Sequence, residues 1–106
     1  MNETELDNII IIIKKLKDDI SQTLSYFKDI KKIDTPEILN VLIFFISDDK
    51  VDVLFFMPPS YYNKIGYKLS KNLISQKIDE YLNKYSFFKM LYLSDITPER
   101  KPDLIV

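Results

Sequence analysis

The chain lacks several of the residue types on which enzyme sites most often depend. It has no cysteine, no histidine, no tryptophan, no alanine and a single glycine, Gly66. Without cysteine it can form neither a disulfide nor a cysteine-ligated zinc site. Without histidine it has no side chain that ordinarily titrates near neutral pH as a general base. One glycine cannot build a glycine-rich loop around a phosphate, so an enzyme would have to rely on carboxylates or lysines.

The residues that are present are those of a single folded domain. The chain has 106 residues, of which 46% are hydrophobic and 29% are charged, and this is sufficient to bury a core. The 15 Lys and Arg against 16 Asp and Glu give a net charge of -1, which argues against coating nucleic acid through overall basicity. The apolar runs are far shorter than the ~20 residues of a membrane span. We therefore expect one cytoplasmic domain over residues 1–106 that does not enter a membrane.

The spacing of apolar residues predicts a long amphipathic helix over residues 4–33. Two series of positions lie seven residues apart, and all but one are apolar: Leu6, Ile13, Ile20 and Phe27, then Ile9, Leu16, Thr23 and Ile30. Five consecutive isoleucines at 9–13 cover every side of a helix, so Ile11 and Ile12 have no place on a single buried stripe. A β-strand over this run is the alternative, because isoleucine favours strands.

The rest of the chain predicts a hairpin, a second helix, a third strand and a tail. The expected segments are a β-hairpin at 37–57, a helix at 60–85, a strand at 87–96 and a proline-containing tail at 97–106. The residues of the second helix expected to face inwards are Ile65, Leu69, Leu73, Ile78, Leu82 and Tyr85. The tail is either a short edge strand or a disordered end. We expect an α+β fold in the order α-β-β-α-β(-β), in which a small three- or four-stranded mixed sheet packs against two long helices.

Carboxylates gather around the expected turn of the hairpin. Asp48 and Asp49 stand in the turn and Asp52 follows it; we call these three residues the acidic hairpin. Aspartates are also common in turns that have no function. As a functional surface, the acidic hairpin would attract and steer the basic surface of a protein partner. With Lys50, the same carboxylates could instead hold a Mg²⁺ ion beside a phosphate, as carboxylate nucleases do.

Lysines recur along one side of the expected second helix. Lys64, Lys68 and Lys71 follow the spacing i, i+4, i+7, with tyrosines between and beyond them. A row of lysines beside stacking aromatic rings suits single-stranded nucleic acid. The same row is also the ordinary solvated face of an amphipathic helix. Arg100 is the only arginine, so the side chain best suited to bidentate recognition of phosphates and guanine is nearly absent.

Phenylalanines occur as adjacent pairs, with one pair in each expected strand. The pairs are Phe44–Phe45, Phe55–Phe56 and Phe87–Phe88. Neighbouring residues of a strand point to opposite faces of the sheet, so both faces carry phenylalanine and both need to be covered. Two helices could cover them, or one helix and a partner subunit. With Ile11 and Ile12 as candidate interface residues, the pattern predicts a homodimer or a tight protein partner.

Together these features favour a small non-enzymatic protein that binds and occludes a protein partner through the acidic hairpin. Inhibitors, immunity proteins and viral or mobile-element counter-defence proteins act in this way. The alternative is a nucleic-acid-binding protein that uses the row of lysines, and the third hypothesis is a metal-dependent nuclease that uses the acidic hairpin. The favoured function requires no catalytic residue, no metal and no cofactor. No motif in the sequence is specific enough to name a family.

Overall fold

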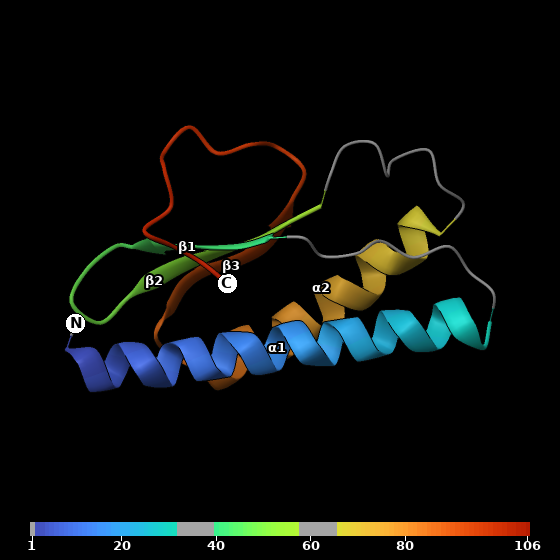
Figure 1. The fold of residues 1–106 in the computed structure, drawn as a ribbon, viewed down its shortest axis with the longest axis horizontal. Helices are drawn as coiled ribbons and strands as arrows, with labels where there is room; N and C mark the ends of the chain where they lie inside the picture. The colour runs from blue at the N-terminus through green and yellow to red at the C-terminus, as the bar shows by residue number, and fades with distance from the viewer. Residues whose placement is uncertain (1, 32–39, 58–65) are drawn as a thin grey trace.

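The computed structural model describes residues 2–31, 40–57 and 66–106. Within these ranges the chain forms two helices and a four-stranded sheet (Figure 1). In chain order the elements are α1 (Glu3–Asp29), β1 (Asn40–Phe45), β2 (Val51–Phe56), α2 (Tyr67–Lys84), β3 (Phe88–Ser94) and β4 (Leu104–Ile105). The fold is α+β in the expected order, and the tail contributes the fourth strand.

The sheet is mixed, and its strands lie in the order β3-β2-β1-β4. Strands β1 and β2 form the expected antiparallel hairpin, and β3 returns parallel to β2 after the crossover through α2. Strand β4 pairs antiparallel with β1 through Leu104 and Ile105. Strand β1 is therefore an interior strand, and four of its six residues are buried. Burial on both faces explains why its sequence is apolar without alternation.

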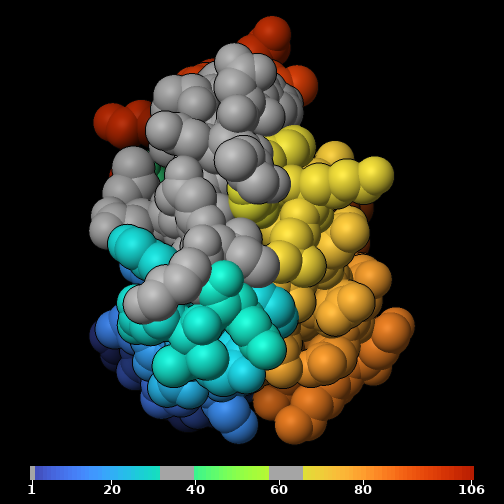
Figure 2. Space-filling view, turned by 90° about the vertical axis from the view of Figure 1, so that its right-hand side faces the viewer, coloured from blue at the N-terminus to red at the C-terminus, as the bar shows by residue number. Residues whose placement is uncertain are grey.

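Both helices cover one face of the sheet, and the segment between β3 and β4 crosses the opposite face (Figure 1). Figure 2, an end-on view of the helical layer, shows α1, in blue to cyan, beside α2, in yellow to orange. The main core fills the space between the helices and the sheet, with Ile13, Ile20, Val53, Phe55 and Ile74 among its buried members. A smaller cluster of Leu42, Phe44 and Leu54 lies on the other face.

Helix α1 begins at a cap that Asn2 supplies. The Asn2 side-chain oxygen accepts a hydrogen bond from the Glu5 N–H at 2.8 Å, and the Asn2 Nδ2 donates to the Glu5 carboxylate at 3.1 Å. The buried stripe of the helix is Ile9, Ile13, Leu16, Ile20 and Leu24. The isoleucine run is therefore helical, and the strand alternative for it is wrong. The helix ends at Asp29, earlier than the expected residue 33.

The core-facing side of helix α2 agrees only in part with the expected one: Ile78 is buried, and Leu73 and Tyr85 are partly buried against the core. It begins at Tyr67 after Gly66, and residues 60–65 of the expected helix lie outside the described residues. Its buried residues are Ser70, Ile74, Ile78 and Tyr81. Leu82, expected to face inwards, is 38% exposed. The Tyr81 hydroxyl donates to the Asp19 carboxylate of α1 at 2.5 Å, so a polar contact between the helices joins apolar packing in setting the rotation of α2.

Within the described residues, the C-terminal tail lies over the second face of the sheet, opposite the two helices. The Arg100 guanidinium lies 5.6 Å from the centroid of the Phe44 ring and donates to the Phe45 carbonyl at 3.1 Å. The Asp103 carboxylate accepts from the Arg100 guanidinium at 3.0 Å and from the Phe45 N–H at 2.7 Å. These bonds and the β4 pairing make the tail an ordered edge, the first of the two alternatives expected from the sequence.

The phenylalanine pairs are not all divided between the two faces. Phe55 is fully buried in the core on the helix side, and Phe44 is buried on the tail side. Phe87, however, lies in the turn before β3 and not in the strand. Its ring packs beside that of Phe88, with 4.4 Å between the centroids, so this pair does not place one ring on each face as expected. The strand begins one residue later than the alternation requires.

Candidate functional site

A hollow lies where α1 begins, the hairpin turns and α2 ends. We call it the hairpin groove; its volume is about 430 Å³. Three segments line it: Glu5, Asn8, Ile9 and Ile12 of α1, Asp49 and Lys50 of the β1–β2 turn, and Lys84, Tyr85, Ser86 and Phe87 between α2 and β3. Residues separated by more than 70 positions in the sequence therefore form one surface.

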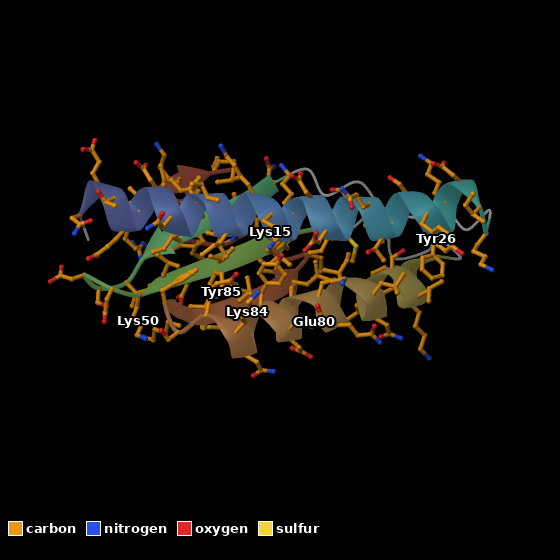
Figure 3. All side chains as sticks on the ribbon, turned by 90° about the horizontal axis from the view of Figure 1, so that it is seen from below. Lys15, Tyr26, Lys50, Glu80, Lys84 and Tyr85 are labelled. Carbon is orange, nitrogen blue, oxygen red and sulfur yellow. The ribbon has the colours of Figure 1, made fainter. Side chains whose placement is uncertain are left out.

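Hydrogen bonds and ring contacts hold the walls of the hairpin groove in place. The Lys50 ammonium donates to the Ser86 carbonyl at 2.5 Å and ties the hairpin turn to the α2–β3 turn. The Lys84 ammonium lies 5.4 Å from the centroid of the Tyr85 ring, and the Tyr85 and Phe87 rings meet edge to face at 5.5 Å. Figure 3 shows Lys50, Lys84 and Tyr85 together at this end of the helical layer. The groove is therefore preformed in the unbound chain.

The floor of the hairpin groove is apolar and its rim is charged. Ile9 is buried, and Ile12, Tyr85 and Phe87 are partly buried against the core. The carboxylates of Glu5 and Asp49 stand on the rim, and both residues are exposed. An apolar centre with aromatic rings, surrounded by a polar rim, is the usual composition of a protein–protein contact.

The two isoleucines expected at an interface have different environments. Ile12 lines the hairpin groove and packs against the core. Ile11 points away from the core and is 63% exposed. The structure therefore places Ile12 in the same hollow as Asp49, and Ile11 on the solvent side of the same helical turn.

Acidic side chains surround this end of the molecule. Glu3, Glu5 and Asp7 on the first turns of α1 are exposed, as are Asp48 and Asp49 in the hairpin turn. Figure 1 shows the beginning of α1 and the hairpin turn at the same end of the molecule. A second hollow of about 300 Å³ lies between them, lined by Leu6, Phe45, Ile46, Ser47 and Asp48. The first turns of α1 thus add carboxylates to those that the sequence placed in the hairpin.

Asp52 is separated from the other two members of the acidic hairpin. It lies in β2 opposite Phe44, on the face of the sheet that the tail covers. Its carboxylate borders a hollow of about 230 Å³ lined by Phe44, Asp52, Tyr92, Pro98, Glu99 and Arg100. The Oδ1 atom is buried and has no hydrogen-bond partner among the described residues. Successive strand residues point to opposite faces of the sheet, so a shift of one position along β2 would move the Asp52 carboxylate to the helix side.

The candidate nucleic-acid and metal residues form no comparable site in the described part of the chain. Lys68 and Lys71 are exposed near the start of α2, and Lys64 lies outside the described residues. In the described ranges, no three carboxylate, histidine or cysteine side chains come together in an arrangement that could hold a metal ion.

The sequence indicated only part of the hairpin groove. Asp49 and Ile12 were candidate partner-binding residues, but Glu5, Lys84 and Phe87 were not. Tyr85 was expected to face the core, and the aromatic segment at the end of α2 was the one signal that could have identified this wall. The close approach of the α2–β3 turn to the hairpin depends on tertiary packing, which no local pattern reveals.

Within the described residues, no helix is both long enough and apolar enough to cross a membrane. The geometry of the hairpin groove is the basis for a functional assignment, because no protein-family model, no curated protein and no solved structure gives a significant match to the chain.

Proposed function

We propose that the protein is a small binding protein that occludes a protein partner, and that the hairpin groove and the acidic end around it form the contact surface. One observation carries the proposal: exposed carboxylates from α1 and the hairpin turn surround a preformed groove with an apolar, aromatic floor. A groove whose walls are already tied together loses little conformational entropy when a partner binds.

The charges define the kind of partner that fits. Five exposed carboxylates, those of Glu3, Glu5, Asp7, Asp48 and Asp49, lie at this end. Two lysines also line the groove: the Lys50 ammonium donates to the Ser86 carbonyl, and the Lys84 ammonium lies over the Tyr85 ring. A basic partner surface that places an apolar or aromatic side chain in the groove would match both the rim and the floor.

An acidic occluding surface suits an inhibitor or immunity protein, including a viral or mobile-element counter-defence protein. Such a surface can occupy a basic cleft that normally receives a phosphate-rich substrate, and opposite charges accelerate the encounter. Asp52 belongs to a different face, so Asp48 and Asp49, together with the acidic first turns of α1, carry this function.

The test compares charge reversals at two places. Tagged wild-type protein and the Asp48→Lys/Asp49→Lys variant are used to capture partners from a lysate of the natural source, with and without nuclease. We expect one stoichiometric protein to bind the wild type after nuclease treatment and to be lost from the hairpin variant. Asp79→Lys/Glu80→Lys is the matched control, because these neighbouring carboxylates are also exposed but lie on α2 outside the groove.

The affinity of the captured protein then tests the mechanism. Charge steering predicts an association rate that falls as salt increases, and the hairpin reversal should reduce that dependence. Equal binding by wild type and the hairpin variant would contradict the proposal. Capture that disappears with nuclease treatment and weakens in a Lys68→Gln/Lys71→Gln variant would favour the nucleic-acid alternative instead.

A further inference from the structure

Strand β3 leaves one edge of the sheet open. The strand order is β3-β2-β1-β4, and among the described residues no strand pairs with the outer side of β3. The opposite edge is β4, which has only two residues, whereas β3 has seven. A long edge strand presents a row of backbone donors and acceptors that can pair with another strand.

The hydrogen bonds to β2 show which backbone groups of β3 face outwards. The Ser94 carbonyl accepts from the Met57 N–H at 2.9 Å, so Ser94 directs its backbone groups toward β2. Because these groups alternate along a strand, Leu91, Leu93 and Asp95 direct theirs to the open edge. The ladder has one irregularity: Phe88 is opposite Val51 and Met90 is opposite Asp52, so Lys89 is an extra residue and the outer row is regular from Met90 onwards.

The side chains along this edge do little to prevent pairing. Edge strands of monomeric proteins usually carry charges or proline that repel a second strand. Within Phe88–Ser94 the only charged residue is Lys89, which is itself the irregularity. Beyond it Met90 is 48% exposed, and Tyr92 and Leu93 are only partly buried. The regular part of the edge is therefore apolar and uncharged.

We infer that β3 pairs antiparallel with β3 of a second copy of this chain, with the two-fold axis at Tyr92. This arrangement sets Tyr92 opposite its own copy, Leu91 opposite Leu93, and Lys89 opposite Asp95 on both sides of the axis. The two four-stranded sheets then become one continuous sheet. This inference is independent of the hairpin groove, since none of the pairing residues lines it.

Charge complementarity selects this register over its neighbours. A shift of the axis to Leu91 would set Lys89 opposite Leu93, and a shift to Leu93 would set Asp95 opposite Leu91. Only the axis at Tyr92 gives each charged residue an opposite charge, twice per dimer. Opposite charges facing each other across an antiparallel pair stabilise it, and like charges destabilise it.

The absence of cysteine from the chain allows a direct test of the axis. At the proposed axis the two Tyr92 residues form a non-hydrogen-bonded pair, in which the Cα atoms lie about 4.5 Å apart. This separation is within the range of a disulfide. Tyr92→Cys should therefore form a disulfide-linked dimer under mild oxidation. Met90→Cys is the control: residue 90 is more exposed, but the two copies lie four residues out of register, roughly 13 Å apart.

A charge exchange gives a second test, which uses no cysteine. Lys89→Asp and Asp95→Lys should each weaken the dimer about tenfold in sedimentation equilibrium, because each places two like-charged pairs across the axis. The double variant should recover the wild-type dissociation constant, whereas Lys101→Asp, in the exposed tail, should leave it unchanged.

Three results would overturn the inference. The first is a wild-type chain that stays monomeric at all concentrations, which would leave the edge for a foreign strand. The second is equal crosslinking of Tyr92→Cys and Met90→Cys, which would indicate collision and not a defined register. The third is a double charge variant as weak as either single variant.

Discussion

Tyr81 joins the two helices through a single hydroxyl group. Its ring is buried between α1 and α2, and its hydroxyl donates to the Asp19 carboxylate at 2.5 Å. Burial raises the pKa of Tyr81 above its ordinary value of 10.0, and the hydrogen bond to Asp19 and the charge of that carboxylate raise it further. Because the pKa of Tyr81 is higher in the folded state than in the unfolded state, its contribution to the free energy of unfolding is fully present below the unfolded pKa. This contribution is lost as the pH rises from the unfolded pKa through the folded pKa.

Tyr81→Phe should lower the free energy of unfolding by about 1–2 kcal/mol at neutral pH, because a hydrogen bond to a charged group is removed. Above about pH 10 the wild type should lose stability relative to the variant by about 1.4 kcal/mol per pH unit, since only its unfolded state ionises there. Urea denaturation on both sides of that pH measures the difference. Tyr26→Phe, at a half-exposed ring, should retain the wild-type pH dependence, and a constant Tyr81→Phe difference would refute the assignment.

Asp52 is a polar residue in an apolar setting. Its Oδ1 atom is buried without a partner in the described part of the chain, opposite Phe44 and beside Tyr92. Asp52→Val should therefore increase the free energy of unfolding by about 1 kcal/mol, since an unpaired buried acceptor is removed and valine favours a strand. Asp52→Asn keeps a polar group at this position, so its free energy of unfolding should increase less than that of Asp52→Val in the same urea titration. A destabilising Asp52→Val would show that the carboxylate has a partner in solution.

At the scale of whole elements, the Asp103 carboxylate holds the C-terminal tail against β1. Asp103 accepts from the Phe45 N–H at 2.7 Å and from the Arg100 guanidinium at 3.0 Å, and so joins the tail to β1. Asp103→Ala should cost about 1–2 kcal/mol of stability and accelerate hydrogen exchange at the Phe45 amide. Asp103→Asn, which retains an acceptor oxygen, should recover part of both effects. Glu99→Ala in the same tail should leave the exchange rate at Phe45 unchanged.

At the scale of the whole molecule, the hairpin groove and the open edge of β3 are separate surfaces. Asp48→Lys/Asp49→Lys should abolish partner capture but leave the crosslinking yield of Tyr92→Cys unchanged. Conversely, Lys89→Asp should weaken the dimer but not the association with the captured protein. Effects of distant, unconnected sites on free energy are additive. Loss of both properties in either variant would indicate that the two surfaces are coupled or that the variant is misfolded, which circular dichroism would distinguish.

The sequence by itself determined the class of elements and much of their order. Seven-residue spacing was sufficient for α1, because four of the eight positions in its two series are buried: Ile9, Ile13, Leu16 and Ile20. Continuous apolar residues identified β1 as an interior strand for the same reason, since burial on both faces leaves no place for polar side chains. The absence of cysteine and histidine, together with a single glycine, excluded several kinds of enzyme site. Local periodicity and composition carry this information because they depend on which residues can be buried.

Only the tertiary structure decided which surfaces these elements make. The spacing of leucines and lysines in α2 did not predict that Tyr81 would be buried and would donate to Asp19 of α1. The crossover through α2 brought Tyr85 and Phe87 beside Ile12, and the folding back of the tail covered Phe44 without a second helix. Among the described strands, the order β3-β2-β1-β4 leaves the outer edge of β3 unpaired. Each of these outcomes depends on contacts between residues far apart in the chain, and the free energy of those contacts is not encoded in the local pattern of either partner.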